Sequence, residues 1–269
     1  MTSSLRTVAI EAAREAGRIM RAHYGQTQQI TFKGEVDLVT DVDQASEQLI
    51  VQRIQSRFPD HQILSEESGA LFVSGSGSGY RWIIDPLDGT TNFAHGYPFF
   101  CVSIGVEVDG VSRLGVVYAP ILDELFVAEL GAGAFLNGRK IVVSATDRLI
   151  RALLATGFNY DRSLAHANLP NWERLLDRTQ ALRRDGSSAL NLCYVAAGRF
   201  DGYWEIGLKP WDAAAGTLMV REAGGTVTDF SGNAHRLTDG TLLATNSGLH
   251  DDLRALLTGP NQEQRAHVQ

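Results

Sequence analysis

The stretch WIIDPLDGTTNF, from Trp82 to Phe93, decides the fold, because it reads as a buried strand, a rigid turn and the start of a helix. Its apolar beginning leads directly into Asp85, and Asp88 follows immediately before Gly-Thr-Thr. Two carboxylates at the end of a buried strand repel each other, and they are costly to desolvate unless a cation or a proton lies between them. The stretch therefore predicts a core strand that delivers two aspartates to a charged ligand.

The residues between and after the aspartates indicate which ligand this is. Pro86 fixes its own φ and favours an extended Asp85, which leaves the carbonyl of Leu87 free to face the same side. Carboxylate and carbonyl oxygens, with no His or Cys nearby, indicate magnesium rather than zinc. Gly89-Thr90-Thr91 begins a short helix whose unpaired N–H groups suit a phosphate. Together these features predict a phosphate ester held against magnesium.

The rest of the chain has the pattern of a layered α/β protein. It has 269 residues, of which 44% are apolar and 20% charged, with a net charge of −7. This balance excludes a disordered or fibrous class, and no basic stripe indicates nucleic-acid binding. Apolar periodicity predicts helices over residues 5–24, 41–58, 168–179, 188–197, 211–223 and 249–257. Strands are expected near residues 61–68, 80–86, 99–108, 112–120, 123–130, 153, 200–206 and 225–230, with an antiparallel meander from Phe99 to Leu130.

Three further features concern the environment of the chain. Cys101 and Cys193 lie in apolar runs and are expected to be buried, reduced thiols. The N-terminal residues contain scattered charges and no long apolar run, which predicts a cytoplasmic protein without a signal peptide or membrane span. The SGSGSG stretch, Ser74 to Gly79, predicts a flexible surface loop.

The acidic residues gather where apolar strands end or helices begin, which is where α/β proteins place their sites. Such patches hold Asp37, Asp41, Asp43, Glu66, Glu67, Asp85, Asp88 and Asp212. Each patch also has a structural interpretation: Asp41, Asp43 and Asp212 suit helix N-termini, and Glu66-Glu67 suits a solvated turn. The Asp85 and Asp88 pair fits such an interpretation least well.

The quoted stretch, with EES at Glu66–Ser68 and WDAAAGTLMVREAGG at Trp211–Gly225, resembles the inositol monophosphatase family of magnesium-dependent, lithium-sensitive phosphatases. VDLVTDVD, ATGF, GAGAFLNG and RRDGSSALNLCYVAAGRFDGYWEIGLKPWD bring it closer to the bacterial inositol-1-monophosphatase subgroup. The resemblance implies an alternating α-β-α-β-α sandwich of the sugar phosphatase type. It also implies a homodimer of single catalytic domains (1–269), each with two packed sub-lobes of approximately 1–145 and 146–269.

The resemblance further implies roles for individual residues. A first magnesium ion would be held by Glu66, Asp85 and the Leu87 carbonyl, and a second by Asp85, Asp88 and Asp212. A weaker third ion would lie on Glu66 and water. A metal-activated water would attack the phosphorus, with Glu66 orienting it and Thr90 and Asp43 completing the hydrogen-bonded relay.

The resemblance also implies a set of residues that contact the substrate: Asp88, Gly89, Thr90, Gly186, Ser187, Ser188, Glu205 and Asp212. Ser187 and Ser188 also suit the N-cap of the following helix. Lys33 lies one residue closer to VDLVT than the family pattern places its lysine, so an exposed loop lysine is an equal interpretation.

Several functions remain open at this point. The first is hydrolysis of myo-inositol 1-phosphate and related polyol or sugar monophosphates. Alternatives with the same chemistry are fructose-bisphosphatase, histidinol phosphatase and phosphoadenosine phosphatase. A different class is a regulatory partner of the transcription machinery, which some bacterial relatives in this subgroup are. The acidic cluster also fits a purely structural cation site.

Overall fold

The structure is a computed structural model that describes residues 2–26, 30–32, 38–68, 71–72 and 79–257. Lys33, Asp37 and residues 74–78 of the predicted flexible loop lie outside the described residues.

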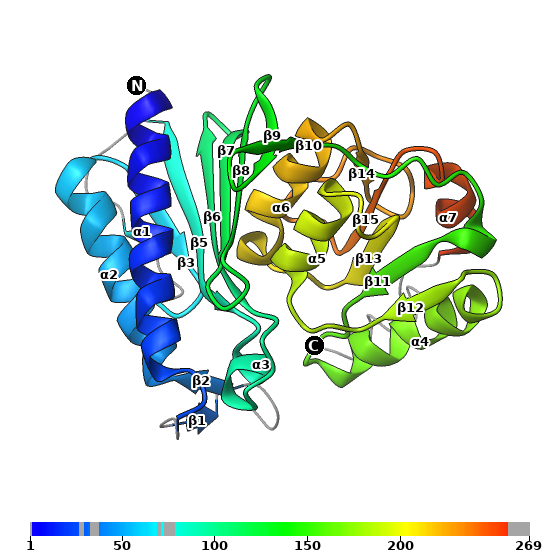
Figure 1. The fold of residues 1–269 in the computed structure, drawn as a ribbon, viewed down its shortest axis with the longest axis horizontal. Coiled ribbons are helices and arrows are strands. Elements are labelled where there is room, and N and C mark those ends of the chain that lie inside the picture. Colours follow the sequence, from blue (N-terminus) through cyan, green and yellow to red (C-terminus); the bar gives the residue numbers. More distant parts are fainter. Residues whose placement is uncertain (1, 27–29, 33–37, 69–70, 73–78, 258–269) are drawn as a thin grey trace.

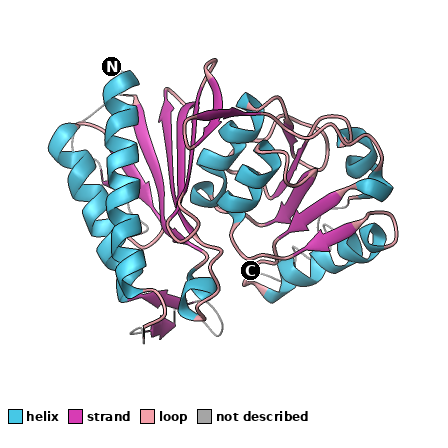
Figure 2. Cartoon of the chain, in the orientation of Figure 1, coloured by secondary structure: helices cyan, strands magenta, loops and turns pink. Residues whose placement is uncertain are grey.

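The described chain forms helices and sheets in alternating layers, as Figures 1 and 2 show, and this confirms the predicted α-β-α-β-α sandwich. Helices α1 (Thr2–His23) and α2 (Asp41–Arg57) cover the outer face of a large sheet. Helices α5 (Ser188–Ala196) and α6 (Pro210–Glu222) lie between this sheet and a smaller one. Helices α4 (Arg162–Leu176) and α7 (His250–Leu256) cover the far face of the smaller sheet.

The large sheet has eight strands in the order β10-β9-β8-β7-β6-β5-β3-β4. They are β3 (Gln62–Ser65), β4 (Leu71–Phe72), β5 (Tyr80–Asp88), β6 (Cys101–Val108), β7 (Val111–Ala119), β8 (Glu124–Glu129), β9 (Gly133–Leu136) and β10 (Arg139–Ile141). The predicted meander is confirmed, since β6, β7 and β8 pair antiparallel in sequence order. Strand β3 pairs parallel to β5, so the Glu66 turn and the Asp85 strand end reach the same edge of the sheet.

The smaller sheet has five strands in the order β12-β11-β13-β15-β14. They are β11 (Leu153–Thr156), β12 (Ala181–Arg183), β13 (Gly202–Ile206), β14 (Thr226–Thr228) and β15 (Thr241–Thr245). A small hairpin of β1 (Ile30–Phe32) and β2 (Leu38–Thr40), the short helix α3 (Thr90–Ala94) and a 3₁₀ turn at Leu149–Arg151 complete the described elements.

Local signals placed the boundaries of most predicted elements within a few residues, with one clear error, but they did not predict strands β9, β10, β12 and β15. Helix α2 begins after its predicted N-cap, Thr40, whose side chain and Asp43 form a reciprocal capping box. The predicted start of a helix at residue 168 is wrong, because α4 already begins at Arg162. Asp161 caps α4 by accepting a hydrogen bond from the N–H of Ser163 at 2.8 Å. The first turns of α4 mix Leu164, Ala165 and Ala167 with polar residues, and Pro170 lies inside the helix, so no clear apolar period marks its start.

Helix α6 lies very close to the large sheet, because glycines face alanines at the contact. A Cβ added at Gly105 would lie 2.7 Å from the Cβ of Ala214. A Cβ added at Gly115 would lie 2.7 Å from the carbonyl oxygen of Ala215. Both separations are below ordinary van der Waals contact, so only glycine permits this spacing of the layers.

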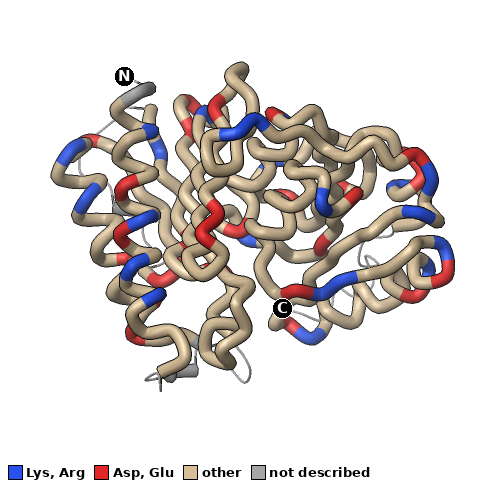
Figure 3. The backbone as a smooth tube through the Cα atoms, in the orientation of Figure 1, with Lys and Arg blue, Asp and Glu red and all other residues tan. Residues whose placement is uncertain are grey.

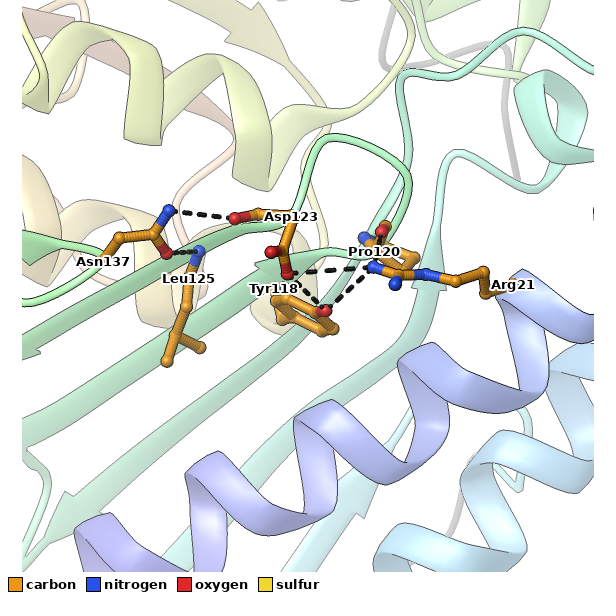
Figure 4. A network of polar contacts seen from close by, with 6 residues as sticks. All are labelled: Arg21, Tyr118, Pro120, Asp123, Leu125 and Asn137. Carbon is orange, nitrogen blue, oxygen red and sulfur yellow. Dashed lines mark hydrogen bonds and ion pairs between the residues drawn. The ribbon is translucent and has the colours of Figure 1, made fainter.

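The C-terminal end of α1 is tied to the turn between β7 and β8 by the polar network in Figure 4. The Arg21 guanidinium donates to the Tyr118 hydroxyl at 3.2 Å and to the Pro120 carbonyl. The Tyr118 hydroxyl in turn donates to the Asp123 carboxylate at 3.0 Å, and Asn137 Nδ2 donates to the Asp123 carbonyl at 2.9 Å. These contacts hold the outer helical layer on the sheet that carries β5.

Two sequence predictions about the environment can be compared with the described residues. Cys101 and Cys193 are both buried free thiols, as predicted. Lys and Arg are interspersed with Asp and Glu over the backbone of both halves (Figure 3). No helix in the described ranges is both long and apolar enough to cross a membrane.

Candidate active site

A bulge at Pro86 and Leu87, near the end of β5, interrupts the strand ladder between the two aspartates of the opening motif. Asp85 pairs with Ser103 and Asp88 with Cys101, so two residues of β5 lie opposite one residue of β6. The reason is local: Pro86 has no N–H to donate to the ladder. The strand continues to Asp88, two residues beyond the predicted range of 80–86, and the Leu87 N–H donates to Asp85 Oδ1 at 3.1 Å.

The aspartates reach a cavity of about 420 Å³ where three helices begin. Gly89 and Thr90 come from the start of α3, Ser187 and Ser188 from the start of α5, and Asp212 from the first turn of α6. The other lining residues include Glu66, Asp85, Leu87, Asp88, Gly157, Arg184, Gly186, Asn191, Glu205 and Lys209. Because a helix N-terminus carries partial positive charge, the longer helices α5 and α6 favour an anionic group in this cavity.

The carboxylates in the cavity lie close enough together that each makes ionisation of the others less favourable. Burial raises the pKa of Asp85 well above its usual value, and repulsion by Glu66, Asp88 and Asp212 raises it further. The pKa of Asp212 is also well above its usual value, because of burial and then the charge of Asp88. Charges in such a cluster are relieved by protons or by a cation.

The donor atoms fit a hard divalent cation in their chemistry, since they are carboxylate oxygens together with the Leu87 carbonyl. Within the described ranges, however, no three His, Cys, Asp or Glu side chains stand close enough together to form a ready-made metal cluster. The cavity thus gathers oxygen ligands of the kind that such a cation prefers.

Asp88 is held in place by the start of α5. Its Oδ2 accepts hydrogen bonds from the Ser187 hydroxyl at 2.6 Å and from the Ala189 N–H at 2.7 Å. Its Oδ1 accepts a longer one, at 3.3 Å, from the Ser188 N–H. Burial raises the pKa of Asp88, and these bonds act in the opposite direction. The Ser187 hydroxyl also accepts from the Leu190 N–H at 3.4 Å, so the residue is at once the N-cap of α5 and the support of Asp88.

Thr90 and Asp43 are in direct contact, although 47 residues separate them in the chain. The Thr90 hydroxyl lies 2.9 Å from Asp43 Oδ1 and 3.0 Å from the Leu87 carbonyl oxygen. Asp43 Oδ2 accepts from the Thr40 N–H at 2.9 Å, which completes the capping box of α2. The two interpretations of Asp43, helix cap and partner of Thr90, are therefore compatible.

The structure brings most of the predicted site residues to one place. Glu66, Asp85, Leu87, Asp88, Gly89, Thr90, Gly186, Ser187, Ser188, Glu205 and Asp212 line the cavity. Asp43 does not line it but contacts Thr90, which does. Asp41 and Glu67 do not line it either; Asp41 is exposed in the first turn of α2, as expected of a charge at a helix start.

Sequence reasoning missed the wall formed by the loop after β11, from Gly157 to Asp161, and the two cations Arg184 and Lys209. The position of Lys209 carried a usable signal, because it immediately precedes the helix that bears Asp212. The loop carried no such signal, since its place depends on the pairing of β11 with β13.

The chain is similar in sequence and structure to known proteins of one family. The sequence model of the inositol monophosphatase family matches residues 1–265. An inositol-1-monophosphatase of Synechocystis sp. is 47% identical over 257 residues, which cover 95% of this chain and 89% of that protein. A Nus factor SuhB of Pasteurella multocida is 48% identical over 240 residues, covering 88% and 89%. The solved inositol monophosphatase of Anabaena (Nostoc) sp. superposes with a TM-score of 0.86 at 43% identity, covering 97% of this chain and 99% of that one.

Proposed function

Because the chain belongs to the inositol monophosphatase family, we propose that it is a magnesium-dependent phosphatase of myo-inositol 1-phosphate and related polyol or sugar monophosphates. The observation that carries this proposal is that the carboxylates of Glu66, Asp85, Asp88 and Asp212 meet the starts of α5 and α6 in one cavity. A phosphate ester bound together with magnesium presents both the cation and the anion that this arrangement favours.

Glu66, Asp85, Asp88, Asp212 and the Leu87 carbonyl are the residues that would hold magnesium, with Asp85 shared between two ions. When bound, magnesium would lower the pKa of a water molecule and offset the charge on the leaving alkoxide. The hydrogen bonds from the start of α5 support this assignment, because they leave Asp88 ordered before any ion arrives.

Thr90 and Asp43 suit the handling of the attacking water. If the Thr90 hydroxyl donates to Asp43 Oδ1 over 2.9 Å, its oxygen keeps a lone pair that can accept a hydrogen bond from a water in the cavity. Glu66 lines the same cavity and would orient that water from the other side. Asp43 is buried and already fixed by the cap of α2, so the Thr90 hydroxyl keeps one direction.

The test is a panel of initial rates on myo-inositol 1-phosphate, fructose 1,6-bisphosphate, histidinol phosphate and phosphoadenosine phosphate. We expect turnover of inositol 1-phosphate with magnesium, loss of it with a chelator, and inhibition by lithium. Asp85→Asn should abolish turnover, whereas Asp41→Asn, an exposed charge outside the cavity, should retain it. A marked preference for histidinol phosphate or phosphoadenosine phosphate would refute the inositol assignment. Turnover that continues unchanged when a chelator is added would refute the metal assignment.

A second function is favoured by the relatives named Nus factor SuhB, which point to contact with the transcription machinery. We infer that such a role would be separable from catalysis. A deletion strain complemented by the Asp85→Asn chain tests this: growth restored without phosphatase activity would support the partner role, and failure of that variant alone would count against it. Size-exclusion chromatography with light scattering tests the expected homodimer.

A further inference from the structure

Glu205 lies on β13 with a second polar side chain on the same face of the strand. Side chains two residues apart on a strand point the same way, so Tyr203 and Glu205 both face the start of α5. The Tyr203 side chain is fully buried and Glu205 is 6% exposed. A carboxylate at this depth requires hydrogen-bond donors.

Two donors converge on one oxygen of this carboxylate. The Tyr203 hydroxyl donates to Glu205 Oε2, and the Ser188 hydroxyl donates to the same atom at 3.0 Å. The other oxygen, Oε1, accepts no hydrogen bond from any residue within the described ranges. Burial keeps the pKa of Tyr203 well above its usual value, so this hydroxyl remains a donor.

The backbone at the end of the neighbouring strand, β11, leaves Glu205 little freedom to turn. A Cβ added at Gly157 would lie 2.2 Å from both Glu205 oxygens. The carboxylate is therefore bounded by a glycine on one side and tied through Oε2 on the other, while its residue lines the cavity. Of its two oxygens, only Oε1 is left to accept a hydrogen bond from a ligand.

We propose that Tyr203 and Ser188 are positioning residues that tie down Glu205 through Oε2, so that Oε1 accepts a hydrogen bond from a ring hydroxyl of the substrate. The proposal rests on the proposed function and specifies its substrate class. The favoured ester is one whose polyol ring presents a neutral hydroxyl at this point. Burial raises the pKa of Glu205 to about 7, so its ionised form would repel a second phosphate or a carboxylate there, and an ester without a hydroxyl would gain nothing from it.

The variant Tyr203→Phe keeps the buried ring and removes only the hydroxyl. It should raise KM for myo-inositol 1-phosphate about tenfold, as expected for a hydrogen bond to a charged group, with a much smaller effect on kcat. The loss in kcat/KM should be at least about fivefold smaller with p-nitrophenyl phosphate, which carries no hydroxyl. Ser188→Ala should shift KM in the same direction and retains the backbone N–H that Asp88 accepts.

Tyr194→Phe is the matched control, since Tyr194 on α5 donates to Glu124 at 3.3 Å and does not line the cavity. A Glu205→Ala background shows whether Tyr203 acts through Glu205: there, Tyr203→Phe should change KM less than twofold. Melting temperatures check that each variant is folded.

Three results would overturn the proposal: an unchanged KM in Tyr203→Phe, an equal loss with p-nitrophenyl phosphate, or a full effect in the Glu205→Ala background. In each of these cases the wild-type chain still hydrolyses the polyol ester, so the proposed function survives. A wild-type chain that hydrolyses p-nitrophenyl phosphate and no polyol ester would instead overturn the proposed function and the role of Glu205 together.

Discussion

Substitution of Gly115 by alanine should separate helix α6 from the large sheet and reduce activity without touching a cavity residue. Gly115 lies on β7, opposite the backbone of Ala215 in α6. An added Cβ would lie 2.7 Å from the Ala215 carbonyl oxygen and 3.1 Å from its Cα, whereas ordinary contact begins at 3.4 Å. The obstructing atoms are backbone, so no side chain can swing aside, and the helix must move by about 0.7 Å.

The displacement matters because Asp212 is on the same helix, about 4.5 Å along the axis from Ala215. Overpacking of this kind costs about 1–3 kcal/mol of unfolding free energy, or about 2–10 °C in melting temperature for a chain of this size. A shift of several tenths of an ångström exceeds the tolerance of metal–ligand distances, which is about 0.2 Å. We therefore expect kcat to fall about 10- to 100-fold.

Urea unfolding and initial rates at saturating magnesium measure the two effects. Gly248→Ala is the matched control, because a Cβ at Gly248 meets its nearest atom at 3.5 Å and its φ is not positive. That variant should keep stability within about 0.5 kcal/mol. If Gly115→Ala kept both the stability and the kcat of the wild type, the spacing of α6 would not be what positions Asp212, and the reasoning would fail.

Three further changes test other parts of the structure. Ser187→Ala removes the N-cap of α5 and a hydrogen bond to Asp88, so urea unfolding should show a loss of about 1–2 kcal/mol. Gly157→Ala places a Cβ 2.2 Å from the Glu205 oxygens, and we expect KM for inositol 1-phosphate to rise more than kcat falls; equal KM values would contradict this. Burial lowers the pKa of His235 to about 4, so the unfolded chain takes up a proton first as the pH falls. The contribution of His235 to stability should thus drop by up to about 3 kcal/mol between pH 6.5 and 4, so the melting temperature of His235→Leu should rise relative to that of the wild type as the pH falls through this range.

The parts of the fold that the sequence predicted well are those with local causes. Thr40 and Asp43 form a cap from residues three apart, and Pro86 interrupts a ladder at its own position. Apolar periodicity located α5 and α6 because both helices are buried between the sheets, where packing demands apolar residues. The start of α4 was missed because the cap, and not the periodicity, marks it.

The contacts that order the site are of a different kind, because they join residues far apart in the chain. The bond from Ser187 to Asp88 spans 99 residues, and that from Thr90 to Asp43 spans 47. Ser187 could be predicted as a helix cap from local sequence, but which carboxylate lies against that cap depends on the pairing of the layers. Motif resemblance anticipated the residues; only the structure shows that the start of α5 holds Asp88 and that Tyr203 and Ser188 hold Glu205.

The arrangement also explains why rigid packing surrounds the carboxylates. Burial and mutual repulsion raise the pKa of Asp85 and Asp212, so the folded chain bears an unfavourable interaction that a bound cation would relieve. A flexible scaffold would let these side chains move apart and lose the site. Helix α6 cannot move away from the sheet without losing the dispersion contacts that its close glycine–alanine packing against β6 and β7 provides. This close contact therefore holds Asp212 near the other carboxylates in spite of their repulsion, where all of them can reach a shared ion. The repulsion lowers the stability of the chain when no metal is bound.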